Sequence, residues 1–135
     1  MTSLPRGLRN NNPLNIRRSS QPWRGKVANP TDKDFEQFIS MEDGLRAAFV
    51  ILRTYIKKYR CDTPRKIIAR WAPAIENDVD AYVKRVQLIS LLRPDEKLTF
   101  TQKNPMCRLV WAMAKVECGQ FISFGRIENA YAMAL

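Results

Sequence analysis

Histidine is absent from the 135-residue sequence. This excludes the Ser-His-Asp and Cys-His mechanisms, because both use an imidazole as the general base. The three cysteines, Cys61, Cys107 and Cys118, form no CxxC pair, so we expect no structural zinc and no other metal or cofactor. Any acid–base catalysis must therefore come from a carboxylate, Lys, Tyr or Cys.

Long apolar runs are also missing. No stretch of eighteen apolar residues occurs, so we expect no membrane span. The first residues, MTSLPRGLRNNN, include no apolar segment of the kind found in a Sec signal peptide, so none is expected. An odd number of cysteines without such a signal is typical of a reducing compartment, which predicts ordinary buried thiols.

Acidic residues are few relative to basic ones. The 13 Asp and Glu residues and the 23 Lys and Arg residues give a formal net charge of +10. Such a charge favours polyanionic partners, namely nucleic acid, anionic membrane surfaces or anionic cell-wall polymers. A cluster of basic residues lies within residues 6–26: Arg6, Arg9, Arg17, Arg18, Arg24 and Lys26. Contact with DNA and plain surface solvation both remain open for this cluster, and no nucleic-acid-binding motif accompanies it.

The rest of the composition predicts a single folded domain over residues 1–135. Hydrophobic residues make up 45% of the chain, which is enough for a core and argues against disorder. Residues 1–34 have the character of a loop, since four prolines punctuate an Asn-rich segment. Two short stretches, residues 22–27 and 34–40, favour a small β-hairpin near the N-terminus.

The first predicted helices follow this loop. Apolar residues recur at three- and four-residue spacing over residues 41–60, and Ser40 is the expected N-cap. Thr63-Pro64 has the pattern of an N-cap followed by proline at the first helical position, which predicts a short helix that Pro73 ends.

Three further helices complete the prediction. Asn77 is the expected cap of the next helix, and Asn104-Pro105 is expected to begin a strongly apolar one that ends at Gly119. A last helix is predicted over residues 124–134. The fold class is therefore mainly α (α+β), with a minor β element near the N-terminus.

Glu117 lies in the last turn of the apolar helix, in the segment WAMAKVECGQF. Two effects there disfavour its charged form. The unpaired carbonyls at the helix end carry partial negative charge, and apolar neighbours reduce hydration. Both raise the pKa of the carboxyl group, as a general acid at neutral pH requires. The alternative is a surface glutamate that ends an amphipathic helix.

A resemblance favours the catalytic interpretation. AMAKVECG, residues 112–119, is similar to the segment A-x-x-x-E-S-G/A of lysozyme-like enzymes, in which the glutamate is the general acid. NNNPLNIR, WRG and FEQFISMEDGLRAA resemble bacterial N-acetylglucosaminidases of the flagellar, autolysin type, which carry NNLFGIK, W-x-G and F-x-x-Y/F-x-S in that order. The resemblance implies a lysozyme-like helical domain that acts on peptidoglycan as a glycosidase or lytic transglycosylase.

The order of these segments differs from that in the enzymes, where the catalytic helix precedes the Asn-rich segment. A circular permutation would account for the difference, because chain termini often lie close together. The helix ending at Glu117 would then pack beside the RNNNPLNIR loop.

Nearly the whole chain also resembles small phage and prophage virion proteins. The segments that carry this likeness are RGLRNNNPLNIRRS, RWAPAIENDVDAYV and AMAKVECG. The likeness implies a location in the virion, or in the bacterial cytoplasm before release. It also implies other virion proteins as partners.

Other carboxylates are weaker candidates. Glu76, in RWAPAIEND, is interpreted first as a loop residue that bonds to backbone or pairs with a nearby arginine. Asp32, Asp34 and Glu36 lie near the predicted hairpin, and one of them could activate water in an inverting glycosidase. Solvated surface charges are the preferred interpretation of all three. The resemblance implies that a lytic transglycosylase needs no second carboxylate.

Candidate substrate ligands come from residue types that suit an aminosugar. They are Asn10, Asn11, Asn12, Asn15, Trp23 and Tyr82. An asparagine amide both donates and accepts, which matches N-acetyl and hydroxyl groups, while an aromatic ring can stack on a sugar face. The alternatives are local hydrogen bonding of the asparagines to backbone, and core positions for the aromatics. Trp71 is interpreted as a core residue first, because it shares a helical face with Ile67 and Ile68.

The leading hypothesis is a phage-derived, lysozyme-like domain that binds peptidoglycan and cleaves its glycan strands, with Glu117 as the general acid. Two alternatives stay open. One is a catalytically inactive virion structural protein with a degenerate lysozyme-like fold. The other is a basic protein that contacts DNA.

Overall fold

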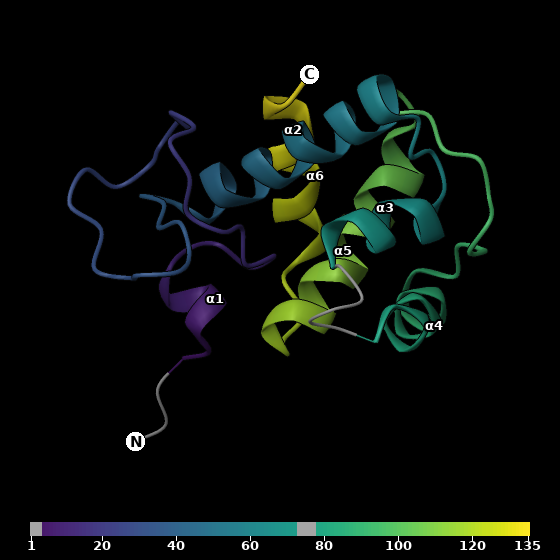
Figure 1. Cartoon of the computed structure of the whole chain (residues 1–135), viewed down its shortest axis with the longest axis horizontal. Coiled ribbons are helices and arrows are strands. Elements are labelled where there is room, and N and C mark those ends of the chain that lie inside the picture. Colours follow the sequence, from purple (N-terminus) through teal and green to yellow (C-terminus); the bar gives the residue numbers. More distant parts are fainter. Residues whose placement is uncertain (1–3, 73–77) are drawn as a thin grey trace.

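The structure is a computed structural model, and it describes residues 4–72 and 78–135. Helices dominate this part of the chain (Figure 1), which confirms the prediction of a mainly α fold. Their bounds are α1 Arg6–Arg9, α2 Met41–Tyr59, α3 Pro64–Trp71, α4 Val79–Ser90, α5 Lys103–Cys118 and α6 Phe124–Met133. None of the described helices combines the length and the apolar character that a membrane span requires.

Helix α5 supplies much of the core and packs against α1, α4 and α6. Most of its apolar side chains are buried, and Met106, Leu109 and Met113 are fully so. Helix α2 packs against α6 and α3, and the ring of Phe49 on α2 meets that of Tyr131 on α6 edge to face at 5.4 Å. Each fully buried side chain of this size contributes about 1.5–3 kcal/mol, so this core is the main source of stability.

Side-chain caps begin two of the helices as predicted. The Ser40 hydroxyl accepts a hydrogen bond from the Asp43 amide at 3.1 Å, and the Thr63 hydroxyl accepts one from the Lys66 amide at 3.2 Å. Gly119 ends α5 as predicted, in a left-handed conformation with φ 80°. These signals are local, which is why the sequence places them correctly.

The predicted start of α5 is wrong by two residues. The helix begins at Lys103, after Gln102, and no side chain caps it. Asn104 therefore lies inside the first turn, where its Oδ1 accepts a hydrogen bond from Arg108 at 3.3 Å. An Asn-Pro pair indicates a helix start, but it does not distinguish the cap from the first turn.

The start of α4 also needs correction. Asp78 caps this helix, because its Oδ1 accepts a hydrogen bond from the Ala81 amide at 3.0 Å. The predicted cap, Asn77, and the predicted stop of α3, Pro73, lie outside the described residues. Helix α3 itself ends at Trp71.

The N-terminal segment departs further from expectation. Residues 4–40 contain isolated antiparallel bridges in place of strands, one of them between Lys26 and Phe38, so the predicted β-hairpin is not confirmed. The Lys26 amide bonds to the Trp23 carbonyl at 3.2 Å and Gly25 has φ 77°, so these residues form a turn. Helix α1 is not predicted, because four residues are too few to show helical periodicity.

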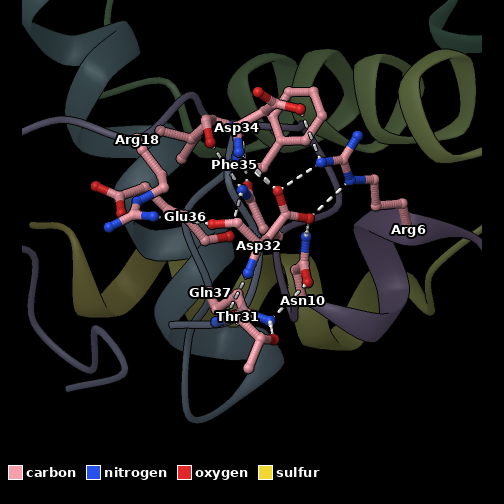
Figure 2. Close-up of polar contacts among 11 residues, drawn as sticks. Arg6, Asn10, Arg18, Thr31, Asp32, Asp34, Phe35, Glu36 and Gln37 are labelled. Atoms are coloured by element: carbon pink, nitrogen blue, oxygen red, sulfur yellow. Dashed lines mark hydrogen bonds and ion pairs between the residues drawn. The ribbon is translucent and has the colours of Figure 1, made fainter. Parts of the chain in front are cut away.

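A polar network ties α1 to the loop of residues 31–37 (Figure 2). Arg6 donates two hydrogen bonds to the Asp32 carboxylate, at 2.7 and 2.6 Å, and Asn10 Nδ2 donates a third at 2.9 Å. The Arg6 guanidinium holds the pKa of Asp32 well below its usual range. The Asp32 side chain is only 8% exposed, so its interpretation as a solvated charge is wrong.

Glu36 is a second correction to that interpretation. Its side chain is 1% exposed, and Oε2 lies 3.1 Å from Lys26 Nζ. The same ammonium donates to the backbone carbonyls of Ser19 and Gln21, at 2.8 and 3.0 Å. The backbone of residues 19–21 therefore contacts the ion pair of Lys26 and Glu36. The spacing of these residues in the sequence does not predict this pairing. Asp34 is exposed, as expected.

The Asn-rich loop also rests directly on α2. A Cβ placed on Gly44, in the first turn of α2, would lie 1.8 Å from the carbonyl oxygen of Asn11. Only glycine allows this approach. Asn11 itself has φ 52° and donates through Nδ2 to the Phe38 carbonyl at 3.0 Å. The loop is therefore an ordered part of the fold.

Candidate functional site

Glu117 lies where the end of α5 meets α1 and the Asn-rich loop. A Cβ placed on Gly7 of α1 would lie 3.2 Å from the Cβ of Cys118 and 3.1 Å from Asn15 Oδ1, so the three segments are in close contact. This contact confirms the expectation that the helix ending at Glu117 packs beside the RNNNPLNIR loop. The Glu117 side chain is half-buried there.

Two uncharged donors hold the Glu117 carboxylate. The Tyr82 hydroxyl donates to Oε2 at 2.9 Å, and Asn15 Nδ2 donates to Oε1 at 3.2 Å. The same Asn15 amide donates to the backbone carbonyl of Glu117, also at 3.2 Å, which satisfies one of the unpaired carbonyls at the helix end. Asn15 has φ 54°, a left-handed conformation that asparagine adopts more readily than most residues.

Burial raises the pKa of Glu117 above its ordinary value. The hydrogen bonds from Tyr82 and Asn15, the positive charge of Arg17 and an interaction with the Trp71 side chain act in the opposite direction, and burial outweighs them. Burial also raises the pKa of Tyr82 well above its ordinary value, and the negative charge of Glu117 adds to this. Tyr82 is therefore a permanent donor at neutral pH.

Two cavities flank the carboxylate. One, of about 290 Å³, is lined by Val116 and Glu117 of α5 and by four residues of α4 and its cap: Asp78, Ala81, Tyr82 and Arg85. The other, of about 190 Å³, is lined by Asn15, Ile16, Arg17, Ile51, Tyr55 and Trp71. The hydrogen bond between Asn15 and Glu117 joins the two linings. The carboxylate thus borders open space on a concave part of the surface.

Of the six predicted substrate ligands, Asn15 and Tyr82 meet Glu117. The amides of Asn10, Asn11 and Asn12 bond to other parts of the protein. Asn12 is fully buried, with Nδ2 donating to the carbonyls of Ile16 and Glu36 at 3.0 and 2.9 Å. The three consecutive asparagines therefore have structural roles. Asn12 bonds to nearby backbone at Ile16, as the alternative expected, whereas Asn10 and Asn11 bond to the distant residues Asp32 and Phe38.

Trp23 is half-buried against the core and lines neither of the two cavities. Asp32 and Asp34 line a different and larger depression, of about 500 Å³, over the Arg6 network. That depression shares no lining residue with the cavities beside Glu117. Glu76 lies outside the described residues. Within those residues, no group of His, Cys, Asp and Glu side chains could hold a metal ion.

The structure adds residues that the sequence analysis did not single out. Asp78 and Arg85 lie four residues before and three residues after the predicted ligand Tyr82, so α4 and its cap present all three toward Glu117. Ile51 and Tyr55 are related in the same way on α2. Trp71 is half-buried and lines the second cavity. Because Tyr82 is already a candidate, helical spacing from it could have predicted that Asp78 and Arg85 lie on the same side.

The chain is similar to a protein of a bacterial virus. Over 84 residues it is 48% identical to Protein P5 of Pseudoalteromonas phage PM2, an alignment that covers 60% of this chain and 52% of that protein. The aligned part thus spans about half the length of the relative. No protein-family model matches the chain. The similarity agrees with the phage likeness expected from the sequence.

Proposed function

We propose that this chain is a phage-derived domain that binds peptidoglycan and cleaves its glycan strands, with Glu117 as the general acid and a lysozyme-like, circularly permuted fold. One observation carries the proposal. A half-buried carboxylate with a raised pKa borders a cavity and is bonded only to uncharged donors among the residues described. Such a group holds a proton closer to neutral pH than an ordinary glutamate does.

The chemistry follows from this environment. Protonated Glu117 gives its proton to the glycosidic oxygen as the bond between that oxygen and the anomeric carbon breaks. The carboxylate that remains accepts hydrogen bonds from the Tyr82 hydroxyl and the Asn15 amide. Since both donors are neutral, they stabilise the anion without locking the group in its ionised form.

The second step distinguishes two reaction types that use the same acid. In a lytic transglycosylase, a hydroxyl of the sugar attacks the anomeric carbon and leaves an anhydro end. In an inverting hydrolase, a second carboxylate about 6.5–9.5 Å away activates water and leaves a reducing end. Asp78 is the second carboxylate that lines the cavity of Glu117, which makes it the candidate base for the hydrolase.

The test is digestion of purified peptidoglycan sacculi. Wild-type protein should release soluble fragments with new glycan ends, and their form assigns the reaction type. Glu117→Gln should abolish the release and keep the fold. Glu128→Gln, which removes a carboxylate paired with Lys103 on the surface of α6, should cleave like wild type. Full activity of Glu117→Gln would contradict the proposal.

A second candidate function is a catalytically inactive component of the virion. The similarity to a phage protein favours it, since that similarity concerns phage origin and not glycan cleavage. It predicts that wild-type protein creates no new glycan ends even at high concentration, and that it co-purifies with virions.

DNA contact is a third candidate, supported by the net charge of +10. It predicts binding to duplex DNA that weakens steeply as the salt concentration rises. Absence of DNA binding at low salt would remove this candidate.

A further inference from the structure

A strip of aromatic and cationic side chains leads away from the cavity beside Asn15. It consists of Trp71, Tyr55, Arg70, Tyr59 and Lys58, and we call it the aromatic–cationic strip. Trp71 and Tyr55 line that cavity, and the other members continue from it over the outer ends of α2 and α3. In Figure 1 the end of α2 lies on the opposite side of the molecule from the loop of residues 17–40.

Close contacts connect the members of the strip. The rings of Tyr55 and Trp71 meet edge to face with centroids 6.2 Å apart. The Arg70 guanidinium carbon lies 5.3 Å from the centroid of the Tyr55 ring and 3.6 Å from that of Tyr59. Lys58 Nζ lies 5.4 Å from the Tyr59 centroid. From Ile51, which lines the cavity, to Tyr59 at the far end of the strip, the cavity and the strip together extend along α2 by about 12 Å, at 1.5 Å per residue.

The charges of the strip lack acidic partners. Within residues 4–72 and 78–135, no carboxylate pairs with Lys58 or Arg70. Nearby cations are different: Arg65 pairs with Asp95 at 3.0 Å, and Lys97 pairs with Asp62 at 2.7 Å. The fold thus neutralises the cations on one side of α3 and leaves those of the strip available.

Tyr59 adds an accessible aromatic ring to the cations of the strip. The residue is 43% exposed, so part of its ring is accessible to a ligand. Arg70 covers one part of its ring, so the ring and the guanidinium present a joint surface with an apolar and a positive portion. Such a surface suits a ligand that combines sugar rings with carboxylates.

We propose that the aromatic–cationic strip is an accessory binding site for the acidic peptide side chains of the glycan strand whose backbone reaches Glu117. This inference rests on the proposed function and names the part of the substrate that the strip recognises. The strip starts at the cavity lined by Asn15, whose amide bonds to Glu117, so one polymer can reach both the strip and the acid. The combined length of cavity and strip suits a polymer more than a single sugar. The two cations, which pair with no carboxylate of residues 4–72 and 78–135, suit the carboxylates of the peptides.

The test separates binding from cleavage. Binding is measured in the Glu117→Gln background, which cannot cleave, on two ligands: intact sacculi, and glycan strands from which an amidase has removed the peptides. The strip variant is Lys58→Gln with Arg70→Gln. The matched control is Arg9→Gln with Lys33→Gln, which removes the same charge from exposed residues beside the N-terminal network. Arg70→Lys tests whether charge restores binding.

The strip variant should bind intact sacculi about tenfold more weakly, equivalent to about 1.4 kcal/mol for the two charges together. Its binding to peptide-free strands should be unchanged. The control variant should bind both ligands like the parent. Arg70→Lys should keep most of the affinity for intact sacculi. Circular dichroism should show the same helical content in all variants, since the altered side chains are exposed.

Three results would overturn the inference. One is equal binding of strip variant and parent to intact sacculi. Another is an equally large loss of binding in the control variant, which would show that the effect depends on net charge and not on the strip. The last is a strip variant that binds duplex DNA more weakly than the parent but binds sacculi equally well, which would assign the strip to nucleic acid. None of these results depends on cleavage, whereas failure of the proposed function would appear as wild-type protein that creates no new glycan ends.

Discussion

The carboxylates of Asp32 and Glu117 both bond to the Asn-rich N-terminal segment, but they receive different donors. Asp32 accepts two hydrogen bonds from the Arg6 guanidinium and one from Asn10. Glu117 accepts its hydrogen bonds from the Tyr82 hydroxyl and the Asn15 amide, which carry no charge. The pKa of Asp32 is lowered and that of Glu117 is raised. A bonded cation stabilises an anion, while burial among neutral donors does so incompletely.

This difference separates two uses of the same chemical group. A carboxylate that stays ionised can hold a loop in place, but it has no proton to donate at neutral pH. A carboxylate among neutral donors can gain and lose a proton while its neighbours stay where they are. The N-terminal segment therefore provides a structural carboxylate on one side and supports a titratable one on the other.

Replacing each carboxylate by its amide should give the largest contrast. Glu117→Gln should slow glycan cleavage roughly 10²–10⁴-fold, the usual contribution of a general acid. Asp32→Asn should keep the rate per folded molecule and lower Tm, because Arg6 loses its charged acceptor. Initial rates on sacculi and thermal unfolding measure the two effects. An equal loss of rate in both variants would remove the distinction.

A side chain at Gly44 should disturb the hydrogen bonds around Asp32 and those around Glu117 together. Gly44→Ala places a Cβ against the Asn11 carbonyl, so we expect a loss of about 3 kcal/mol in the free energy of unfolding, together with lower activity. Gly125→Ala is the matched control, since nothing lies within 4 Å of its added Cβ. The control should be neutral or stabilising by up to about 1 kcal/mol. Denaturant unfolding measures both, and similar values would show that the loop does not rest on α2.

Removing one neutral donor should change the titration of Glu117. The Tyr82 hydroxyl bonds to the ionised carboxylate and lowers its pKa, so Tyr82→Phe should raise that pKa further. Because the acid must be protonated, the alkaline limb of kcat/KM against pH should move to higher pH. Tyr131→Phe, which loses a bond to the Phe100 carbonyl, should leave the limb in place. A limb that stays fixed in Tyr82→Phe would mean that another group titrates.

The smallest effect is the opposite pH dependence of stability for the two carboxylates. Asp32 has a lowered folded pKa, so it stabilises the fold above its unfolded value of about 3.9, and this is lost as pH falls through the folded pKa. Glu117 has a raised folded pKa, so its contribution is present below its unfolded value of about 4.3 and is lost as pH rises through the folded pKa.

Glu117→Gln should therefore unfold at a higher temperature than wild type at neutral pH, and this advantage should shrink toward about pH 4. Asp32→Asn should unfold at a lower temperature at neutral pH, with a deficit that shrinks in stronger acid. Thermal unfolding at a series of pH values measures both variants. A change of unfolding temperature in the same direction in both variants at neutral pH would contradict the contrast between Asp32 and Glu117.

Sequence reasoning succeeded where the signal is local. Caps at Ser40 and Thr63 and the stop at Gly119 depend on residues within one turn. It failed for α1, for the start of α5 and for the burial of the loop carboxylates Asp32 and Glu36. Glu36 lies among polar neighbours in the sequence, yet the fold buries it against Lys26, ten residues earlier. Burial of a charge is a property of the folded chain, since it needs a partner that local pattern does not identify.

The sequence by itself determined the mainly helical class, the apolar character of α5 and the position of Glu117 in its last turn, because periodicity and capping act over a few residues. Only the tertiary structure decided which asparagine meets that glutamate. Asn15 and Glu117 are 102 residues apart, and Tyr82 is 35 residues from the same carboxylate. Their meeting depends on how α1, α4 and α5 pack, and that packing sets the burial and the neutral donors that raise the pKa of Glu117.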